Sequence, residues 1–351
     1  MKHDYLIVGQ GLAGTLLAYH LIESGKSVRI IDNHFKTSSS TVAAGIVNPV
    51  TGRKYTKSWM IDLLIPFALK TYKSLEKKLE IELIHHRNII RTLPDVRSEN
   101  NWFSRFSQDG YQNYLEEDPS LGQFSGMIDE PFSYGEIKQS FQVDLSLLLD
   151  RFRKMYKDNM IDEEFYHDVL KVENDVIVYK DQEFSNIVFS EGYVVKDNPL
   201  FNYLPFEGAK GEVLILHIPG FKPEKILRHK IFFAPLKDDL YWVGSGYAWN
   251  LDEVGPTDSE RERLLNLADD VLKVPYEIKD HIAGVRPASK DRRPIMGTHP
   301  HFSNTHLFNG LGTKGSSLGP YWASRMAEYL LYDHPLDPEV NLNRFTPKED
   351  K

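Results

Sequence analysis

Residues 5–14 read Tyr-Leu-Ile-Val-Gly-Gln-Gly-Leu-Ala-Gly, an apolar run that leads into the spacing Gly-x-Gly-x-x-Gly. This pattern predicts a strand, a tight turn and a helix whose first N–H groups are free to face phosphates. Gly9 permits the turn, Gly11 lets the backbone approach a pyrophosphate, and Gly14 lets the helix pack closely on the strand. The expected dinucleotide contacts in this segment are Gly9, Gly11, Leu12, Ala13 and Gly14.

A second strand and an acidic residue follow the first motif at the expected distance. The pattern predicts a helix over about 13–24, a turn at 25–27 and an apolar strand at 28–31, directly before Asp32. A carboxylate at the end of the second strand accepts hydrogen bonds from ribose hydroxyls in such sites. We therefore expect Asp32 to bind a ribose, with the neighbouring Asn33 also at the cofactor.

Composition is typical of a globular enzyme with two domains. The chain has 351 residues, of which 41% are hydrophobic and 26% charged, and this length can bury a substantial core. The net charge of −8 disfavours non-specific nucleic-acid binding but leaves a local basic patch open. The sequence contains no cysteine, which excludes disulfides, thiolate metal sites, thiol nucleophiles and a thioether link to a cofactor.

The sequence shows no targeting segment, membrane span or metal-binding spacing, and this predicts both the location of the protein and the absence of a metal site. The first strand begins near residue 4, so we expect no signal peptide, and no apolar run approaches the roughly 20 residues that span a bilayer. We therefore expect a cytoplasmic protein without a membrane span. The spacing of His85, His86, His299 and His301 matches no metal site, so we interpret them as loop histidines.

The predicted domains are each built from several segments that alternate along the sequence. Strand-like runs at 212–217, 230–234 and 240–244 predict an antiparallel sheet, and the aromatic-rich stretch 81–141 is interpreted as an insertion. Hydrophobic spacing predicts helices over about 58–79, 144–156, 258–271 and 320–331, and short strands at 167–172, 176–179 and 185–189.

A second Gly-x-Gly-x-x-Gly occurs at 310–315, between a predicted strand at 305–309 and the last helix. No further strand with a ribose-binding acid follows, so a second dinucleotide site is disfavoured. We expect a backbone nest and a helix N-terminus that face one end of a bound cofactor, where N–H dipoles stabilise negative charge. The residues expected there are Gly310, Gly312, Thr313, Lys314, Gly315 and Ser316.

These motifs together resemble the D-amino-acid oxidase family of FAD-dependent oxidoreductases, which includes glycine oxidase and sarcosine oxidase. The resemblance is carried by the N-terminal fingerprint, by Ala-Gly-Ile at 44–46, by Gly-Val-Arg-Pro at 284–287 and by the turn at 310–315. Within the family, the C-terminal motifs look most like the oxidase domain of bifunctional enzymes that complete methylaminomethyl modification of tRNA wobble uridine.

The resemblance implies a noncovalent FAD whose flavin lies between two domains, and an amine substrate whose Cα–H is transferred as hydride to flavin N5. It implies FAD contacts at Ala44, Gly45, Ile46, Val172 and Gly192. Arg286 matches the arginine that grips the substrate carboxylate, and Lys314 adds a cation beside the flavin. The resemblance also implies the fold class: an α/β protein with a Rossmann-like FAD-binding domain (1–80, 143–200 and 282–345) interleaved with an α+β substrate domain (81–142 and 201–281) built on a mostly antiparallel sheet.

One residue departs from the family. Phe232 stands where glycine oxidase has a substrate-site tyrosine, so Tyr241, Trp242 and Tyr247 become candidates for that role. Several functions therefore stay open: oxidation of a small amine or amino acid with oxygen or another acceptor, a tRNA-modifying oxidase, an FAD dehydrogenase that reduces a quinone or a partner protein, and a catalytically silent flavin-binding protein.

Overall fold

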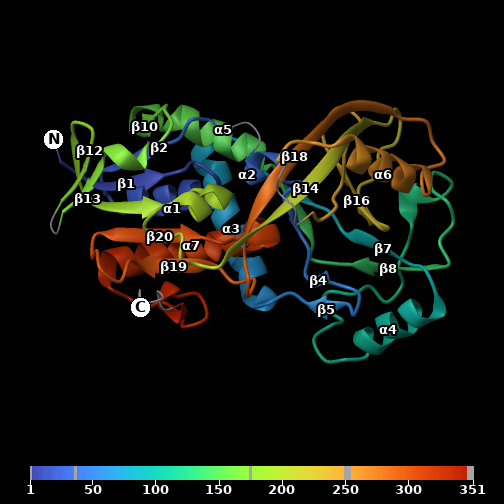
Figure 1. The fold of residues 1–351 in the computed structure, drawn as a ribbon. Helices are drawn as coiled ribbons and strands as arrows, with labels where there is room; N and C mark the ends of the chain where they lie inside the picture. The colour runs from blue at the N-terminus through green and yellow to red at the C-terminus, as the bar shows by residue number, and fades with distance from the viewer. Residues whose placement is uncertain (1, 35–37, 174–175, 249–253, 346–351) are drawn as a thin grey trace.

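The computed structural model describes residues 2–34, 38–173, 176–248 and 254–345. Two large sheets lie at opposite ends of the molecule, and each is built from segments that are far apart in the sequence: residues 2–31, 160–189 and 295–309 in the first, and 89–137 and 206–289 in the second (Figure 1). The expected fold class, an α/β domain interleaved with an α+β domain, is confirmed by this arrangement.

The first sheet has eight strands, five of which run parallel in the order β10-β2-β1-β13-β20. Three antiparallel strands extend it: β12 and β11 beyond β13, and β19 beside β20. The strand bounds are β1 (Lys2–Val8), β2 (Val28–Ile31), β10 (Met160–Ile161), β11 (Leu170–Val172), β12 (Ile177–Tyr179), β13 (Gln182–Phe189), β19 (Ile295–Thr298) and β20 (Thr305–Asn309).

Helix α1 (Leu12–Glu23) connects β1 to β2 within one residue of the expected bounds. Gly9 has a φ of +98°, and a Cβ there would lie 2.6 Å from the Ser190 carbonyl oxygen. A Cβ on Gly14 would lie 1.9 Å from the Gly9 carbonyl oxygen. The tight turn at Gly9 and the close packing of helix on strand at Gly14 are both confirmed.

Three further helices pack around this sheet: α3 (Ile61–Leu79), α5 (Leu145–Met155) and α7 (Gly315–Tyr332). Helix α7 begins five residues before Pro320, where the sequence placed its start. Proline removes the bond to the carbonyl four residues earlier, here that of Ser316. The Tyr72 hydroxyl donates to this carbonyl at 2.9 Å instead, so the helix continues through Pro320 without an unpaired carbonyl at Ser316.

The second sheet has seven strands in the order β18-β14-β17-β16-β15-β7-β8, and only the β15–β7 pair is parallel. Its longest pair, β14 with β18, extends to Ser289, past the domain boundary expected at residue 282. The strand bounds are β7 (Ile89–Leu93), β8 (Ser133–Ile137), β14 (Phe206–His217), β15 (Ile226–Arg228), β16 (Phe232–Pro235), β17 (Leu240–Gly244) and β18 (Glu277–Ser289).

Helix α6 (Asp258–Asp269) packs on one face of the second sheet, and α4 (Val96–Phe106) packs against β7 and β8 (Figure 1). The opposite face turns toward the first sheet, and both sheets contribute to one hydrophobic core between them. Short elements complete the chain: α2 (Ser39–Val42), β3 (Ile46–Val47), β4 (Val50–Thr51), β5 (Thr56–Lys57), β6 (Ile84–His86) and β9 (Phe141–Val143). Within the described ranges, no helix combines the length and the apolar character that a bilayer crossing requires.

Candidate cofactor and substrate site

A pocket opens where β1 and β2 end and α1 begins. Its lining includes both predicted elements of the dinucleotide site, the glycine-rich turn and the acidic residue, and consists of Gln10, Gly11, Asp32, His34, Ser38, Thr41, Ser146, Leu149 and Asp150. The backbone N–H of Leu12 in the first turn of α1 donates to Ser40 Oγ at 3.0 Å. Ser40 thus occupies this N–H, and the helix end presents its positive dipole end to an anionic group.

The Asp32 carboxylate is held in place by three hydrogen bonds. Its Oδ2 accepts from the Gln10 N–H at 2.8 Å, and its Oδ1 accepts from the His34 N–H and from Arg153 Nη2, each at 2.7 Å. An ionised carboxylate offers about four acceptor positions. Asp32 is therefore fixed in orientation and retains acceptor capacity at Oδ2 for a sugar hydroxyl, whereas its neighbour Asn33 is exposed.

Arg153 of α5 is a member of this site that the sequence did not reveal. Besides Asp32, its guanidinium contacts Gln10 Oε1 at 2.9 Å through Nε and pairs with Asp162. It joins α5 to the glycine-rich turn across more than a hundred residues of sequence. No local motif marks such a residue, because only the packing of α5 against α1 and α2 brings it to Asp32.

The Ala44-Gly45-Ile46 segment lies between the two sheets. Gly45 has a φ of +71°, and a Cβ there would lie 1.9 Å from the Val143 carbonyl oxygen. Just before it, the Val42 carbonyl accepts from Trp242 Nε1 of the second sheet at 2.7 Å. Backbone from the nucleotide side thus reaches the sheet expected to bind substrate.

The C-terminal glycine-rich turn has the alternating backbone of an anion-binding nest. Leu311 has right-handed helical angles, and Gly310 and Gly312 on either side of it have φ values of +81° and +55°, an arrangement that points successive N–H groups at one concavity. The turn lies next to Gly192, another predicted FAD contact, because Asn309 Nδ2 donates to the Gly192 carbonyl at 2.8 Å. A Cβ on Gly315 would lie 3.2 Å from Leu12 Cδ2, so the two glycine-rich turns are neighbours.

Lys314, at the end of this turn, lies in a cationic environment. Its Nζ donates to Ser58 Oγ at 3.1 Å. Burial lowers the pKa of Lys314, and the charges of Arg293 and Arg292 lower that pKa further. Together with the helix end at Ser316, these groups favour a negative charge nearby. Thr313, in contrast, is exposed.

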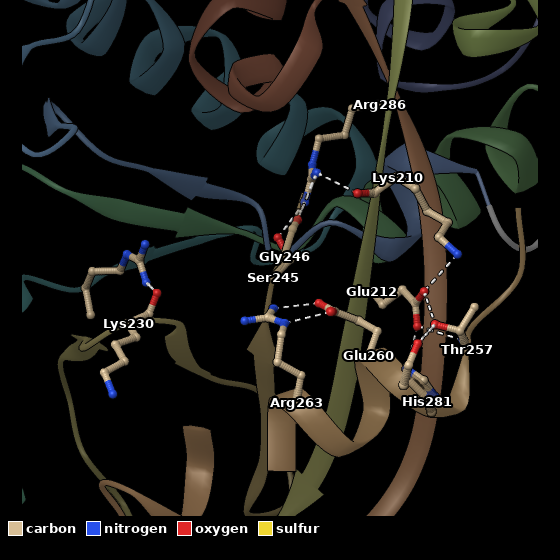
Figure 2. Close-up of polar contacts among 12 residues, drawn as sticks. Lys210, Glu212, Lys230, Ser245, Gly246, Thr257, Glu260, Arg263, His281 and Arg286 are labelled. Carbon is tan, nitrogen blue, oxygen red and sulfur yellow. Dashed lines mark hydrogen bonds and ion pairs between the residues drawn. The ribbon is translucent and has the colours of Figure 1, made fainter. Parts of the chain in front are cut away.

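Arg286, on β18, is half-buried and directed at the loop after β17 (Figure 2). Its Nη2 donates to Ser245 Oγ, and its Nη1 lies 3.4 Å from the Lys210 and Gly246 carbonyl oxygens. A Cβ on Gly211 would fall 2.0 Å from Nη2, so that glycine makes the space for the guanidinium. Burial lowers the pKa of Arg286, and no carboxylate among the described residues pairs with it.

The neighbouring charges of β14, in contrast, neutralise one another on the opposite face (Figure 2). Lys210 Nζ and Glu212 Oε1 form a buried ion pair at 2.8 Å, and the Thr257 N–H donates to Glu212 Oε2 at 2.8 Å. Burial raises the pKa of Glu212, but the bonds from Lys210 and Thr257 outweigh it and leave this pKa below its usual range. This cluster fixes the start of α6, and none of its described carboxylates is paired with Arg286.

The three candidates for the role of the substrate-site tyrosine make different contacts in the structure. The Tyr241 hydroxyl donates to the Phe221 carbonyl in the core beneath α6, and Trp242 is bound to Val42. Only Tyr247 lies at Arg286, with the guanidinium carbon 4.6 Å from the centre of its ring. Of the three candidates, Tyr247 is therefore the one whose position beside Arg286 suits the role of the substrate-site tyrosine.

The strand register shows where Val172 lies in the first sheet. It pairs with Ile177, which pairs with Phe184, which in turn pairs with His3 at the start of β1. Gly9 directly follows the C-terminal end of β1, whereas His3 lies near its N-terminal end. The β11–β12 hairpin is added at the far end of the sheet, so Val172 does not join the other predicted contacts.

The histidines also differ from expectation in part. His85 and His86 lie in strand β6 instead of a loop, whereas His299 packs against Phe201 and Phe302. Among the described residues, no group of three or more His, Cys, Asp or Glu side chains is arranged to hold a metal ion.

Residues 4–329 match the family model described as FAD dependent oxidoreductase. The chain belongs to this FAD-dependent oxidoreductase family. The resemblance noted from the two glycine-rich turns is thereby confirmed, and FAD is the cofactor. The structure fits that cofactor: Gly9 and Gly14 stand where any side chain would clash, and the pocket beside them is lined by Gly11, at the N-cap of α1, and by Asp32.

Two relatives illustrate the range of the family. Glycine oxidase of Bacillus licheniformis is 23% identical to this chain, and the alignment covers 94% of this chain and 93% of the relative. A tRNA 5-methylaminomethyl-2-thiouridine biosynthesis bifunctional protein of Campylobacter jejuni is 23% identical over 83% of this chain. The chain spans about half of the length of that bifunctional relative, 45%.

Solved structures share the fold over nearly the whole chain. Glycine oxidase from Geobacillus kaustophilus has a TM-score of 0.80 at 16% identity, covering 100% of this chain and 99% of its own. Iminodiacetate oxidase from Chelativorans sp. BNC1 has a TM-score of 0.77 at 20% identity, covering 98% of this chain and 99% of its own.

Proposed function

We propose that this protein uses noncovalent FAD to oxidise the C–N bond of an amine or amino acid that carries an acidic group. The observation that carries the proposal is Arg286, a half-buried guanidinium without a carboxylate partner among the described residues, on the sheet face that turns toward the cofactor domain. A planar guanidinium binds a carboxylate through two parallel hydrogen bonds. Arg286 would thus hold the acid and leave the amine to be oxidised.

The reaction removes two electrons from the substrate. Its carbon loses a hydride and its nitrogen a proton, so that the C–N single bond becomes an imine, which water hydrolyses to a carbonyl compound and a free amine. FAD, when bound, supplies the two-electron acceptor. The nest at 310–312 and Lys314 would stabilise the negative charge that the reduced flavin acquires, because preorganised donors and cations act there without reorganisation.

The ribose-binding role of Asp32 predicts a measurable loss of cofactor affinity. Asp32→Ala removes the acceptor at the end of β2 and leaves Arg153 without its partner. We expect FAD to bind more weakly by about 1–3 kcal/mol, the scale of a hydrogen bond to a charged group. Titration of apoprotein with FAD measures this, and unchanged affinity would refute the assignment. Asp158→Ala, on the exposed surface near β10, is the matched control.

The direct test of the proposal is anaerobic mixing of the yellow protein with a panel of amines and amino acids. We expect the flavin absorbance to bleach with at least one acidic amine, and heat or acid to release the FAD into solution.

We further propose a cytoplasmic location and the two interleaved domains named above, with the whole of β18 assigned to the substrate domain. Oxygen is one candidate for the final electron acceptor, and a quinone or a partner protein is another.

A tRNA-modifying oxidase is the second candidate, supported by the match to bifunctional relatives. A modified uridine with a carboxymethylamino group would offer Arg286 the same acidic amine. The net charge of −8 opposes binding of the rest of the tRNA. Retention of tRNA at physiological salt, together with flavin reduction by the modified tRNA, would favour this candidate over a free small molecule.

A further inference from the structure

We propose that Arg91 and Arg228 form a second anion subsite on the same sheet face as Arg286, so that the substrate is an amine with two acidic groups. This inference rests on the proposed function, because it assigns a substrate class to the same site. Neither residue belongs to a motif in the sequence, and the register of the second sheet is what brings them together.

Arg91 of β7 and Arg228 of β15 are direct partners in neighbouring strands. Side chains at paired positions point to the same face of a sheet. The flanking residues show which face this is: Ile89 and Ile226 belong to the core shared with the first sheet, whereas Ile90 and Leu227 belong to the core beneath α6. Both guanidinium groups therefore turn toward the cofactor domain.

Arg286 points to this face as well. Two residues before it, Gly284 packs against Val42 of the first domain, where a Cβ would lie 3.2 Å from Val42 Cβ. Phe232 connects the groups, because its ring lies against the Arg228 guanidinium and its strand partner Gly244 directly precedes Ser245, to which Arg286 donates. The three arginines thus border one region between the sheets.

Neither Arg91 nor Arg228 is neutralised by an acidic side chain in the part of the chain that the structure describes. Arg228 donates to the backbone carbonyls of His229 and Lys230, and Arg91 has a buried Nε without a hydrogen-bond partner. Burial, and next the charge of Arg91, lower the pKa of Arg228 to about 10. Two like charges held together out of water are unfavourable, and an anion between them offsets that cost.

Aromatic rings hold both guanidinium groups in place. The Arg228 guanidinium carbon lies 4.6 Å from the centre of the Phe232 ring, and that of Arg91 lies 5.8 Å from the Tyr55 ring. Such stacking fixes a planar cation while its edge stays available to a carboxylate. The phenylalanine at position 232 therefore serves as a platform for a cation.

Binding of a matched pair of unreactive ligands to the FAD-loaded protein tests the subsite. Thiodiglycolate has a carboxylate on each side of a sulfur atom that replaces the amine, and (methylthio)acetate has only one carboxylate. We expect wild type to bind thiodiglycolate at least about tenfold more tightly in calorimetric titration, the scale of one charge-assisted hydrogen bond.

Three variants locate the effect. Arg228→Gln and Arg91→Gln should remove the preference for thiodiglycolate and leave (methylthio)acetate affinity within about twofold of wild type. Arg228→Lys keeps the charge and loses the planar fork, so it should retain part of the preference even if the glutamine variants fold poorly. Arg97→Gln, at an exposed position of α4, is the control and should behave as wild type.

The outcomes separate this inference from the proposed function. Equal affinity of wild type for the two ligands, or a preference that survives in well-folded Arg228→Gln and Arg91→Gln, would overturn the second subsite alone. Failure of both ligands to bind, with no amine that reduces the flavin, would overturn the proposed function.

Discussion

Gly14→Ala is expected to yield a protein that no longer retains FAD. The added Cβ would lie 1.9 Å from the Gly9 carbonyl oxygen, which is backbone and can yield only if α1 moves away from β1. That movement displaces the first-turn N–H groups and the glycine-rich turn together. Overpacking costs about 1–3 kcal/mol in stability, and an obstacle that is backbone cannot rotate away as a side chain can. The measurements are the flavin content after gel filtration and the thermal unfolding temperature.

Gly255→Ala provides the control for this substitution. Nothing lies within 4 Å of a Cβ added there, and its backbone does not require a glycine. We expect its stability to stay within about 0.5 kcal/mol of wild type and its FAD content to be unchanged. A Gly14→Ala protein with full FAD content would contradict the packing argument at the cofactor turn.

Arg286→Lys is expected to bind acidic ligands at least about tenfold more weakly, or roughly 1.4 kcal/mol, while FAD is retained. Lysine keeps the positive charge but cannot place two N–H groups against one carboxylate, and it loses the stacking on Tyr247. Titration with (methylthio)acetate and thiodiglycolate measures the change, and both ligands should weaken together. FAD loss without a selective effect on anions would instead show that Arg286 has a structural role.

The N-terminal half of the cofactor site was predictable because its determinants are local. The strand, turn and helix of residues 2–23 are specified within a few residues of one another, and Asp32 follows directly from the second strand. The glycines at 310 and 312 were recognisable for the same reason. The start of α7 was not, because the bond from Tyr72 that tolerates Pro320 comes from a distant helix.

The positions of residues that depend on strand pairing or helix packing could not be predicted from the sequence. Val172 has a plausible local sequence, but only the register reveals that its hairpin lies at the start of β1. Arg153 reaches Asp32 through the packing of α5. Arg91 and Arg228 are separated by more than a hundred residues, and their parallel pairing across β7 and β15 has no signature in either segment. The pairing of β14 with β18 as far as Ser289, beyond the domain boundary predicted at residue 282, likewise has no local signature.

The most direct test of the central claim is the flavin absorbance of the FAD-loaded protein after anaerobic mixing with an acidic amine. Iminodiacetate, which carries two carboxylates, and glycine, which carries one, are suitable first substrates. We predict that iminodiacetate bleaches the flavin and yields a carbonyl product, and that it does so at lower concentration than glycine. A flavin that dithionite reduces, but that no amine or amino acid of the panel reduces, would contradict the proposed oxidation of a C–N bond.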